Sequence, residues 1–310
     1  MKLIESKVEY LPQGKGMNGI YKQIEMCGRT CYKSEDKITD TSAEKFVTRM
    51  ISSNHTAMLE HGTVYLKVPG QGLYNQIQDH TYRDYVRNPY SKAKTKMLFE
   101  KEEDVIGLSY SFVTSNLRVL QENYWLNDLQ YLCEPTEFHK KRYTFKFTCS
   151  RAIANELVRH RVFSFAQESQ RYCNYGRDKF GNEVTFIAPH WLPELAGKSI
   201  KTMVEDIEAR DAIRDNQRTT SASWFTSALI DAERCYFEML NGKSSPQQAR
   251  DVLPNATKTE LCMTGFTSDW KRLLDLRLFQ KTGVVHPDML DLMKKLEVVA
   301  KENNIWDELL

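Results

Sequence analysis

Residues 141–162 read KRYTFKFTCSRAIANELVRHRV, a segment whose two halves have different periods. In the first half apolar and polar side chains alternate, as in a strand with one buried face. In the second half Ile153 and Leu157 lie four residues apart, on one face of a helix. The segment therefore predicts a strand that leads directly into a helix. The apolar positions of the strand are Tyr143, Phe145, Phe147 and Cys149.

Toward the N-terminus, the pattern predicts a helix and a second strand. Thr41 is followed three residues later by Glu44, the spacing of a capping box at a helix start. Val64, Leu66 and Val68 then alternate with polar residues, which predicts a half-buried strand. Between this strand and residue 141, a polar stretch predicts a surface excursion, followed by a further strand and helix.

Toward the C-terminus, the pattern is mostly helical. A long helix is expected over 215–241 with Gly242 as its cap. Shorter helices are expected to begin at Ser245 and Ser268, and a last one at Pro287. The chain is therefore predicted to be an α/β (α+β) protein with an antiparallel sheet and a long-helix core, formed as a single domain over 1–310.

The composition is that of an ordinary globular protein. The 310 residues are 41% hydrophobic and 27% charged, which excludes a disordered chain, collagen or a coiled-coil rod. A net charge of +2 gives no reason to expect nucleic acid as a partner. No run of about 18 apolar residues is present, so no membrane association is expected. The seven cysteines lack CxxC spacing, which favours reduced thiols in the cytoplasm, or in a host cytoplasm if the source is viral.

The densest cationic run is Arg159-His160-Arg161. Arginine binds phosphate through a planar fork of donors, so an anion site is one interpretation. A solvated basic helix end is the other. On a helix, successive side chains diverge by about 100°, so these three could not all bind one phosphate. They would serve different ligands, different subunits or solvent.

Other interpretations of the reactive residues remain open at this point. Ser169 is a candidate nucleophile with His160 as its base, although no GxSxG elbow surrounds it. Cys173 is a second candidate, or a buried thiol. A metal site at His55, Glu60 and His61 lacks the spacing of a ligand pair on one helix face, and no metal is expected. Arg250 and Arg277 have two interpretations: they bind a ligand, or they form ion pairs, for instance with Asp251 and Asp275.

The segment RHRVFSFAQESQRY, residues 159–172, resembles the signature of the flavin-dependent thymidylate synthases. Two further blocks are similar in order and spacing: HTAMLEH at 55–61, and QQARDVLP at 247–254 with its following helix that ends in Leu276-Arg277. Arg29-Thr30-Cys31-Tyr32 is a weaker match. Residues 69–140 are interpreted as an insertion that common members of this family lack.

The resemblance implies a homotetramer with active sites shared between subunits. The expected substrate is dUMP, converted to dTMP. The expected cofactor is FAD, with NADPH and methylenetetrahydrofolate as co-substrates: the folate donates a methylene and the NADPH-reduced flavin a hydride. No membrane or nucleic-acid partner is implied, and no enzyme nucleophile is needed on dUMP.

The resemblance also implies roles for individual residues. Arg277 is expected to face the uracil and to stabilise negative charge during catalysis. Residues expected to bind the cofactor are His55, Arg159, His160, Arg161, Gln167, Ser268 and Arg272. Residues expected to bind the substrate are Glu156, Arg159, Gln167, Glu168, Ser169, Gln170, Arg171 and Arg250.

The sequence departs from the family pattern at several of these positions. Where the family has Asn-Glu, this chain has Ala166-Gln167, and where it usually has Gln, this chain has Glu156. Gln and Glu therefore look exchanged, and Glu156 and Gln167 are expected to lie close together; pairing of Glu156 with Arg159 or His160 is the alternative. The family's Asn-x-Arg and later Asn fall on Phe266, Ser268 and Arg272. A flavin-binding relative without methylation activity, and a nucleotide- or RNA-binding protein, are the competing functional hypotheses.

Overall fold

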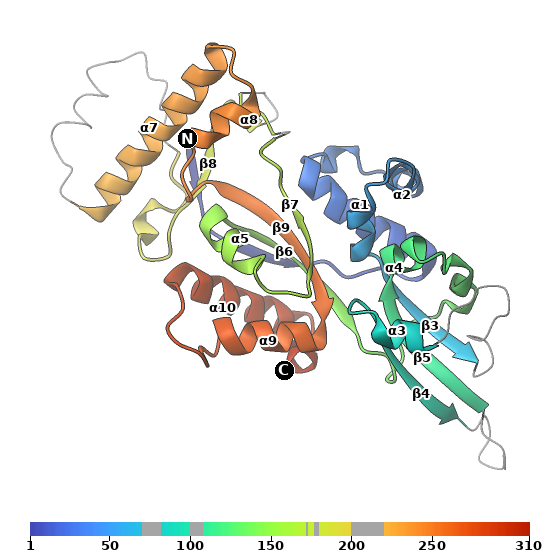
Figure 1. The fold of residues 1–310 in the computed structure, drawn as a ribbon. Helices are drawn as coiled ribbons and strands as arrows, with labels where there is room; N and C mark the ends of the chain where they lie inside the picture. The colour runs from blue at the N-terminus through green and yellow to red at the C-terminus, as the bar shows by residue number, and fades with distance from the viewer. Residues whose placement is uncertain (70–81, 99–107, 172, 177–179, 200–219) are drawn as a thin grey trace.

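The structure, a computed structural model, describes residues 1–69, 82–98, 108–171, 173–176, 180–199 and 220–310. At its centre is a four-stranded antiparallel sheet in the order β2-β6-β9-β7 (Figure 1). The long central strands pair along their whole length, from Arg142 opposite Phe266 to Ser150 opposite Lys258. The strands are β2 (Lys7–Tyr10), β6 (Arg142–Ser150), β9 (Lys258–Phe266) and β7 (Ser164–Gln167).

One face of this sheet is covered by helices that follow its strands in sequence. They are α5 (Arg151–Leu157), α9 (Thr267–Arg277), α10 (Pro287–Glu302) and α11 (Trp306–Leu309). Phe145 and Phe147 of β6 pack there against Trp270 of α9, all fully buried. The hydroxyl of Ser150 accepts a hydrogen bond from the Ile153 N–H and so caps α5 directly at the end of β6.

The opposite face of the sheet is covered by α1 (Gly16–Tyr32), which packs against β7 and β9 (Figure 1). Side chains alternate between the faces along a strand. Ala166 and Cys262 accordingly point to Cys27 of α1, in a separate small cluster. The charged residues Lys146, Lys258 and Glu260 lie on this same face of the sheet.

A second antiparallel sheet has the order β3-β5-β4. Its strands are β3 (Thr63–Pro69), β5 (Leu108–Asn116) and β4 (Lys92–Leu98). Val64, Leu66 and Val68 of β3 are buried in a core shared with α1. The neighbouring elements are α2 (Ser42–Ser52), η2 (Thr56–His61), α3 (Tyr82–Arg87), α4 (Leu117–Glu122) and η3 (Leu126–Tyr131).

A third core lies at the end of the molecule where the N-terminus is found (Figure 1). Strand β1 (Lys2–Ile4) runs parallel to β8 (Thr185–Ile187). The Met1 ammonium lies 3.0 Å from Glu233 of α7, inside this core. The helices here are η5 (Pro193–Leu195), α7 (Ser221–Asn241), α8 (Pro246–Ala249) and η6 (Arg250–Val252), while η1 (Glu35–Lys37) follows α1.

The predicted α+β class with antiparallel sheets is confirmed, and so is the strand-to-helix passage over 141–162. The expected stripe of α10, with Met289, Met293, Leu296 and Ala300, is fully buried. Two details differ. The Thr41 side chain makes no capping hydrogen bond. Helix α5 ends at Leu157, before the cationic run. The first residues expected in the long helix, 215–219, lie outside the described residues. The limits of an insertion at 69–140 stay a prediction.

Candidate functional site

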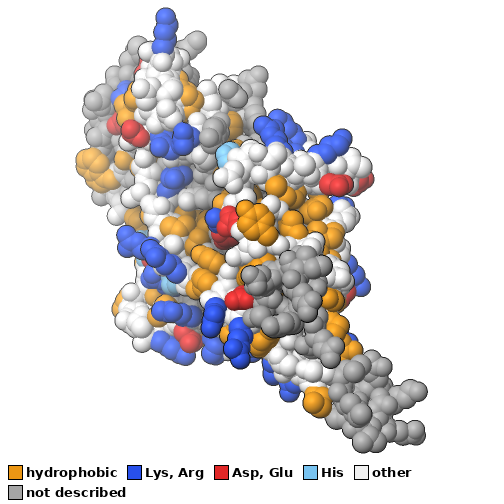
Figure 2. All heavy atoms as spheres, turned by 45° about the vertical axis from the view of Figure 1, so that its right-hand side comes forward, with side chains coloured by type: hydrophobic (Ala, Val, Ile, Leu, Met, Phe, Trp, Pro, Cys, Tyr) orange, Lys and Arg blue, Asp and Glu red, His pale blue; other side chains and the backbone are white. Residues whose placement is uncertain are grey.

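The cationic run Arg159-His160-Arg161 lies in a turn between α5 and β7. Arg159 and Arg161 are exposed, and so is Arg272 on α9. No carboxylate lies within ion-pair distance of these three guanidinium groups among the residues that the structure describes. Two apolar side chains close in sequence to these arginines are also exposed to solvent. Val162 follows Arg161 and is 39% exposed, and Phe279 follows the end of α9 and is 48% exposed. Figure 2 shows Lys and Arg side chains in groups on one face of the molecule, with hydrophobic side chains exposed between them.

Arg277, the residue predicted to be catalytic, is held on two sides of its guanidinium. Its Nε donates a hydrogen bond to His160 Nε2 at 3.0 Å, and its Nη1 lies 3.4 Å from Glu156 Oε2. Its side chain is 27% exposed, so the group remains accessible at the surface. The arrangement brings together a residue from α9, one from α5 and one from the cationic turn. A guanidinium fixed in this way can present its remaining N–H groups to an anionic or carbonyl oxygen.

His160 must be neutral on Nε2 to accept this bond. Burial, together with repulsion from the positive charges of Arg277 and Arg272, lowers the pKa of His160 to about 4. His160 is therefore an uncharged acceptor near neutral pH. In this state it orients Arg277 without competing with it for an anion.

The structure decides between the pairings that the sequence left open for Arg277 and Glu156. Asp275 pairs with Lys281 at 2.6 Å, and Glu156 pairs with Arg277. The Gln167 amide donates to Thr259 Oγ1 at 3.4 Å. No hydrogen bond joins Glu156 to Gln167 within the described part of the chain, so their expected proximity stays a prediction.

Other residues predicted to bind substrate lie at the end of β7, on the α1 side of the sheet. Glu168 is almost fully buried, and its carboxylate accepts a hydrogen bond from Lys258 Nζ at 2.8 Å. The Ser169 N–H donates to the Cys31 carbonyl at the end of α1, at 3.0 Å. Arg171 is exposed, and its N–H donates to Ser169 Oγ at 3.4 Å. Gln170 is buried beside them, and Tyr172 of the motif lies outside the described residues.

Sequence reasoning missed the buried ion network behind this segment. Lys258 lies 2.7 Å from Glu260, which lies 2.6 Å from Lys33. Burial alone would raise the pKa of Glu260, but the two lysines outweigh it and lower that pKa to about 2. The sequence does contain a pattern that could have predicted part of this network. In KTELC, residues 258–262, strand alternation places Lys258 and Glu260 on the same face of one strand.

Arg250 lies at the junction of α8 and η6, near the end of the molecule opposite α9 (Figure 1). Its Nε is 4.0 Å from Asp251, whose side chain is 80% exposed, so the contact is a loose surface pair. The predicted substrate residues therefore form separate groups within one chain. No hydrogen bond or ion pair found among the described residues joins Arg250 or Arg171 to Arg277.

The residues predicted to bind the cofactor lie on several elements: α9, η2, β7 and the turn between α5 and β7. Ser268 is exposed in the first turn of α9, and Arg272 one turn later. Ser268 and Arg277 are about 14 Å apart along this helix, at 1.5 Å per residue. His55 is exposed at the start of η2, which packs against β7 and β9. Phe266, where the family has Asn, is buried at the beginning of α9.

The geometry disfavours Cys173 as a nucleophile, and it gives His61 and Glu60 partners other than a shared metal ion. Burial raises the pKa of the Cys173 thiol to about 12, and Glu168 contributes to the increase, so the reactive thiolate is disfavoured. His61 is buried and bonds Thr264 Oγ1 at 2.7 Å, while Glu60 pairs with Arg118. The described residues contain no group of three His, Cys, Asp or Glu side chains that could hold a metal ion. Nor does any helix among them have the length and apolar character needed to cross a membrane.

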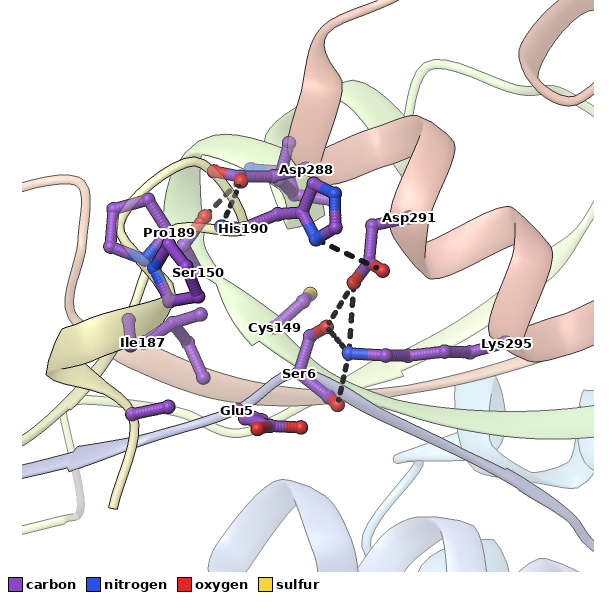
Figure 3. A pocket seen from close by; sticks show the side chains of 14 residues that line it. Glu5, Ser6, Cys149, Ser150, Ile187, Pro189, His190, Asp288, Asp291 and Lys295 are labelled. Atoms are coloured by element: carbon purple, nitrogen blue, oxygen red, sulfur yellow. Dashed lines mark hydrogen bonds and ion pairs between the residues drawn. The ribbon is translucent and has the colours of Figure 1, made fainter.

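A pocket of about 170 Å³ lies away from all of these residues, between the N-terminal segment and α10 (Figure 3). Lys295 Nζ contacts Asp291 at 2.8 Å and Ser6 Oγ at 2.9 Å, and His190 Nδ1 lies 3.4 Å from Asp291. These polar groups therefore contact one another, and they connect α10 with the segments that contain Ser6 and His190. None of the predicted site residues lines this pocket.

Comparison with known proteins identifies the family. The model of the family described as thymidylate synthase complementing protein matches residues 96–296, well over half of the chain. This chain belongs to that family. The match begins inside the segment interpreted as an insertion and contains every predicted site residue except His55.

Two flavin-dependent thymidylate synthases are among the similar sequences. The protein from Corynebacterium efficiens is 32% identical over 150 residues, 44% of this chain and 48% of the relative. The protein from Pyrococcus furiosus is 30% identical over 168 residues, 52% of this chain and 57% of the relative. The chain thus spans about half the length of the relatives it matches.

Two solved structures are also similar. One is the UMP/dUMP methylase PolB from Streptomyces cacaoi bound with 5-Br dUMP, at TM-score 0.42 and 15% identity, covering 100% of this chain and 95% of that one. The other is the flavin-dependent thymidylate synthase ThyX from Helicobacter pylori complexed with FAD and dUMP, at TM-score 0.37 and 14% identity, covering 99% of this chain and 100% of that one. Both TM-scores are low, and neither likeness carries an argument about this chain.

Proposed function

We propose that this protein is a flavin-dependent thymidylate synthase that methylates dUMP. The observation that carries the proposal is the fixed guanidinium of Arg277, held by Glu156 and neutral His160 beside arginines without carboxylate partners in the described structure. Preorganised donors of this kind stabilise charge that develops on a substrate oxygen. Membership of the family supplies the substrate class, and the relatives that carry this activity support it.

The residues present fit FAD as a cofactor. Ser268, Arg272 and the Arg159–Arg161 turn offer exposed donors and positive charge, as an extended diphosphate requires. Partly exposed Phe279 adds apolar surface near the end of α9. When bound, FAD would supply the redox chemistry of the reaction, with NADPH and methylenetetrahydrofolate as co-substrates. The chain's own residues bind and orient the reactants and stabilise charge.

We further propose that the enzyme is a homotetramer whose sites are shared between subunits. Arg277 stands among the helices on one face of the four-stranded sheet, while Ser169 contacts α1 on the other. Layers packed on a sheet lie about 10 Å from it, so one nucleotide cannot easily contact both groups within one chain. A second subunit that supplies the missing group removes this difficulty.

The test begins with purification. A yellow protein with flavin absorption bands is expected, together with tritium release from [5-³H]dUMP that depends on NADPH and methylenetetrahydrofolate. Flavin binding without tritium release would instead support a relative that has lost methylation. A colourless protein that binds RNA would contradict the proposal. For the assembly, sedimentation should give a tetramer, and a stable, fully active monomer would refute the shared site.

A further inference from the structure

We propose that Lys258 is a positioning residue for the substrate-binding segment 169–171, acting through the buried carboxylate of Glu168. The inference rests on the proposed function, because it concerns the segment expected to bind the dUMP phosphate and sugar.

Glu168 comes directly before this segment and is the last residue that the sheet supports. The pairing of β7 with β9 ends at Gln167 opposite Leu261. One further ladder bond follows, from the Glu168 N–H to the Glu260 carbonyl at 2.8 Å. Ser169 then leaves the sheet and donates to the Cys31 carbonyl of α1. The position of Glu168 therefore determines where the chain leaves the sheet, and so where Ser169 and Arg171 lie.

The side chain of Glu168 is secured by Lys258. The carboxylate is 1% exposed, and the Lys258 ammonium, 13% exposed, lies 2.8 Å from it. A buried carboxylate is costly unless it is paired and hydrogen-bonded. If its partner is removed, the charge must gain a proton or reach water, and either change moves the side chain.

Lys258 itself is fixed from the other side. It lies 2.7 Å from Glu260, and Glu260 is held in turn by Lys33, directly after α1. At the same end of α1, the Cys31 carbonyl accepts a hydrogen bond from the Ser169 N–H. A single rigid corner, made of β9 and the end of α1, therefore holds both the carboxylate and the backbone of the segment.

The test is a double-mutant cycle of Lys258→Met and Glu168→Leu, measured singly and together on the full-length, FAD-loaded protein, with dUMP affinity read from the change in flavin absorption on titration. In Lys258→Met the dissociation constant for dUMP should rise about tenfold or more, because a buried charge loses its partner. The double variant Lys258→Met with Glu168→Leu should recover most of this loss, since no buried charge remains. Lys258→Arg keeps the charge and should stay closer to the parent.

Lys146→Met is the matched control. Lys146 belongs to the same network and lies 3.3 Å from Glu9, but makes no ion pair with Glu168 in the described structure. The Lys146→Met variant should have a lower melting temperature than the parent but nearly the same dUMP affinity. FAD content and melting temperature are measured for every variant.

The cycle separates the competing outcomes. Unchanged dUMP affinity in Lys258→Met, with only a lower melting temperature, would overturn the proposal in favour of a purely structural pair. A double variant as weak as Lys258→Met would overturn it in favour of direct contact between Lys258 and dUMP. If Lys258→Met does not fold, Lys258→Arg and the double variant decide the question. A parent protein that does not bind dUMP would refute the proposed function instead.

Discussion

On the α1 side of the four-stranded sheet the buried charges are matched by one another, whereas beside α9 on the other side the arginines outnumber the carboxylates. Lys33, Glu260, Lys258 and Glu168 alternate in sign over contacts of 2.6 to 2.8 Å. Around Arg277 only Glu156 lies within ion-pair distance in the described residues. The first arrangement needs nothing from outside. The second has spare positive charge at the surface, where a bound anion can be accommodated.

The largest expected effect comes from Arg277→Ala. Loss of a preorganised donor at the reacting centre costs on the order of 100-fold or more in turnover. Tritium release from dUMP should fall by this factor while the protein stays folded. Lys281→Ala is the control, because Lys281 pairs with Asp275 near the same helix end and is largely exposed. An equal loss in both variants would show that the helix end, rather than the guanidinium, is required.

Arg171→Ala tests the other side of the sheet. Removing a charge-assisted contact to phosphate costs about 1.5–3 kcal/mol, which corresponds to a roughly 10- to 150-fold weaker dUMP affinity. The flavin spectrum should remain nearly unchanged. Loss of FAD with unaltered dUMP affinity would reverse the assignment of the two ligands.

The neutral state of His160 makes a smaller contribution, visible as pH dependence. Its pKa is about 4 in the folded protein against an ordinary 6.5. Between these values the unfolded chain binds a proton that the folded protein does not, so stability rises with pH across this window. Lowering the pH from 6.5 to 4 should therefore destabilise the parent more than His160→Gln. Melting curves for both proteins at several pH values measure the difference, and parallel curves would contradict it.

The smallest effect is expected for Cys173→Ser. The thiol is buried, and its pKa is raised to about 12. It is therefore no nucleophile near neutral pH, and most thymidylate synthesis should be retained. A folded, FAD-bound variant without activity would restore the covalent hypothesis.

The sequence allowed the elements of the fold to be predicted, because periodicity is a local property. The strand and helix over 141–162 and the stripe of α10 follow from spacing alone. The contact between Glu156 and Arg277 did not, since it joins residues 121 positions apart and depends on how α5 and α9 pack. Glu168 shows the same limit. As a residue type it suggested substrate binding, and only the structure reveals Lys258 as its partner.

Helix α9 also has a consequence for how the protein tolerates change in length. Ser268, Arg272 and Arg277 lie on one uninterrupted helix, so their separation and relative angles are fixed. One residue inserted between Arg272 and Arg277 would turn Arg277 by about 100° and shift it by about 1.5 Å, away from Glu156 and His160. The same insertion at Gly283, in the exposed loop beyond the helix, would leave all three side chains in register. The helix thus fixes both the distance and the angle between the side chains that would contact the two ends of a ligand lying along it.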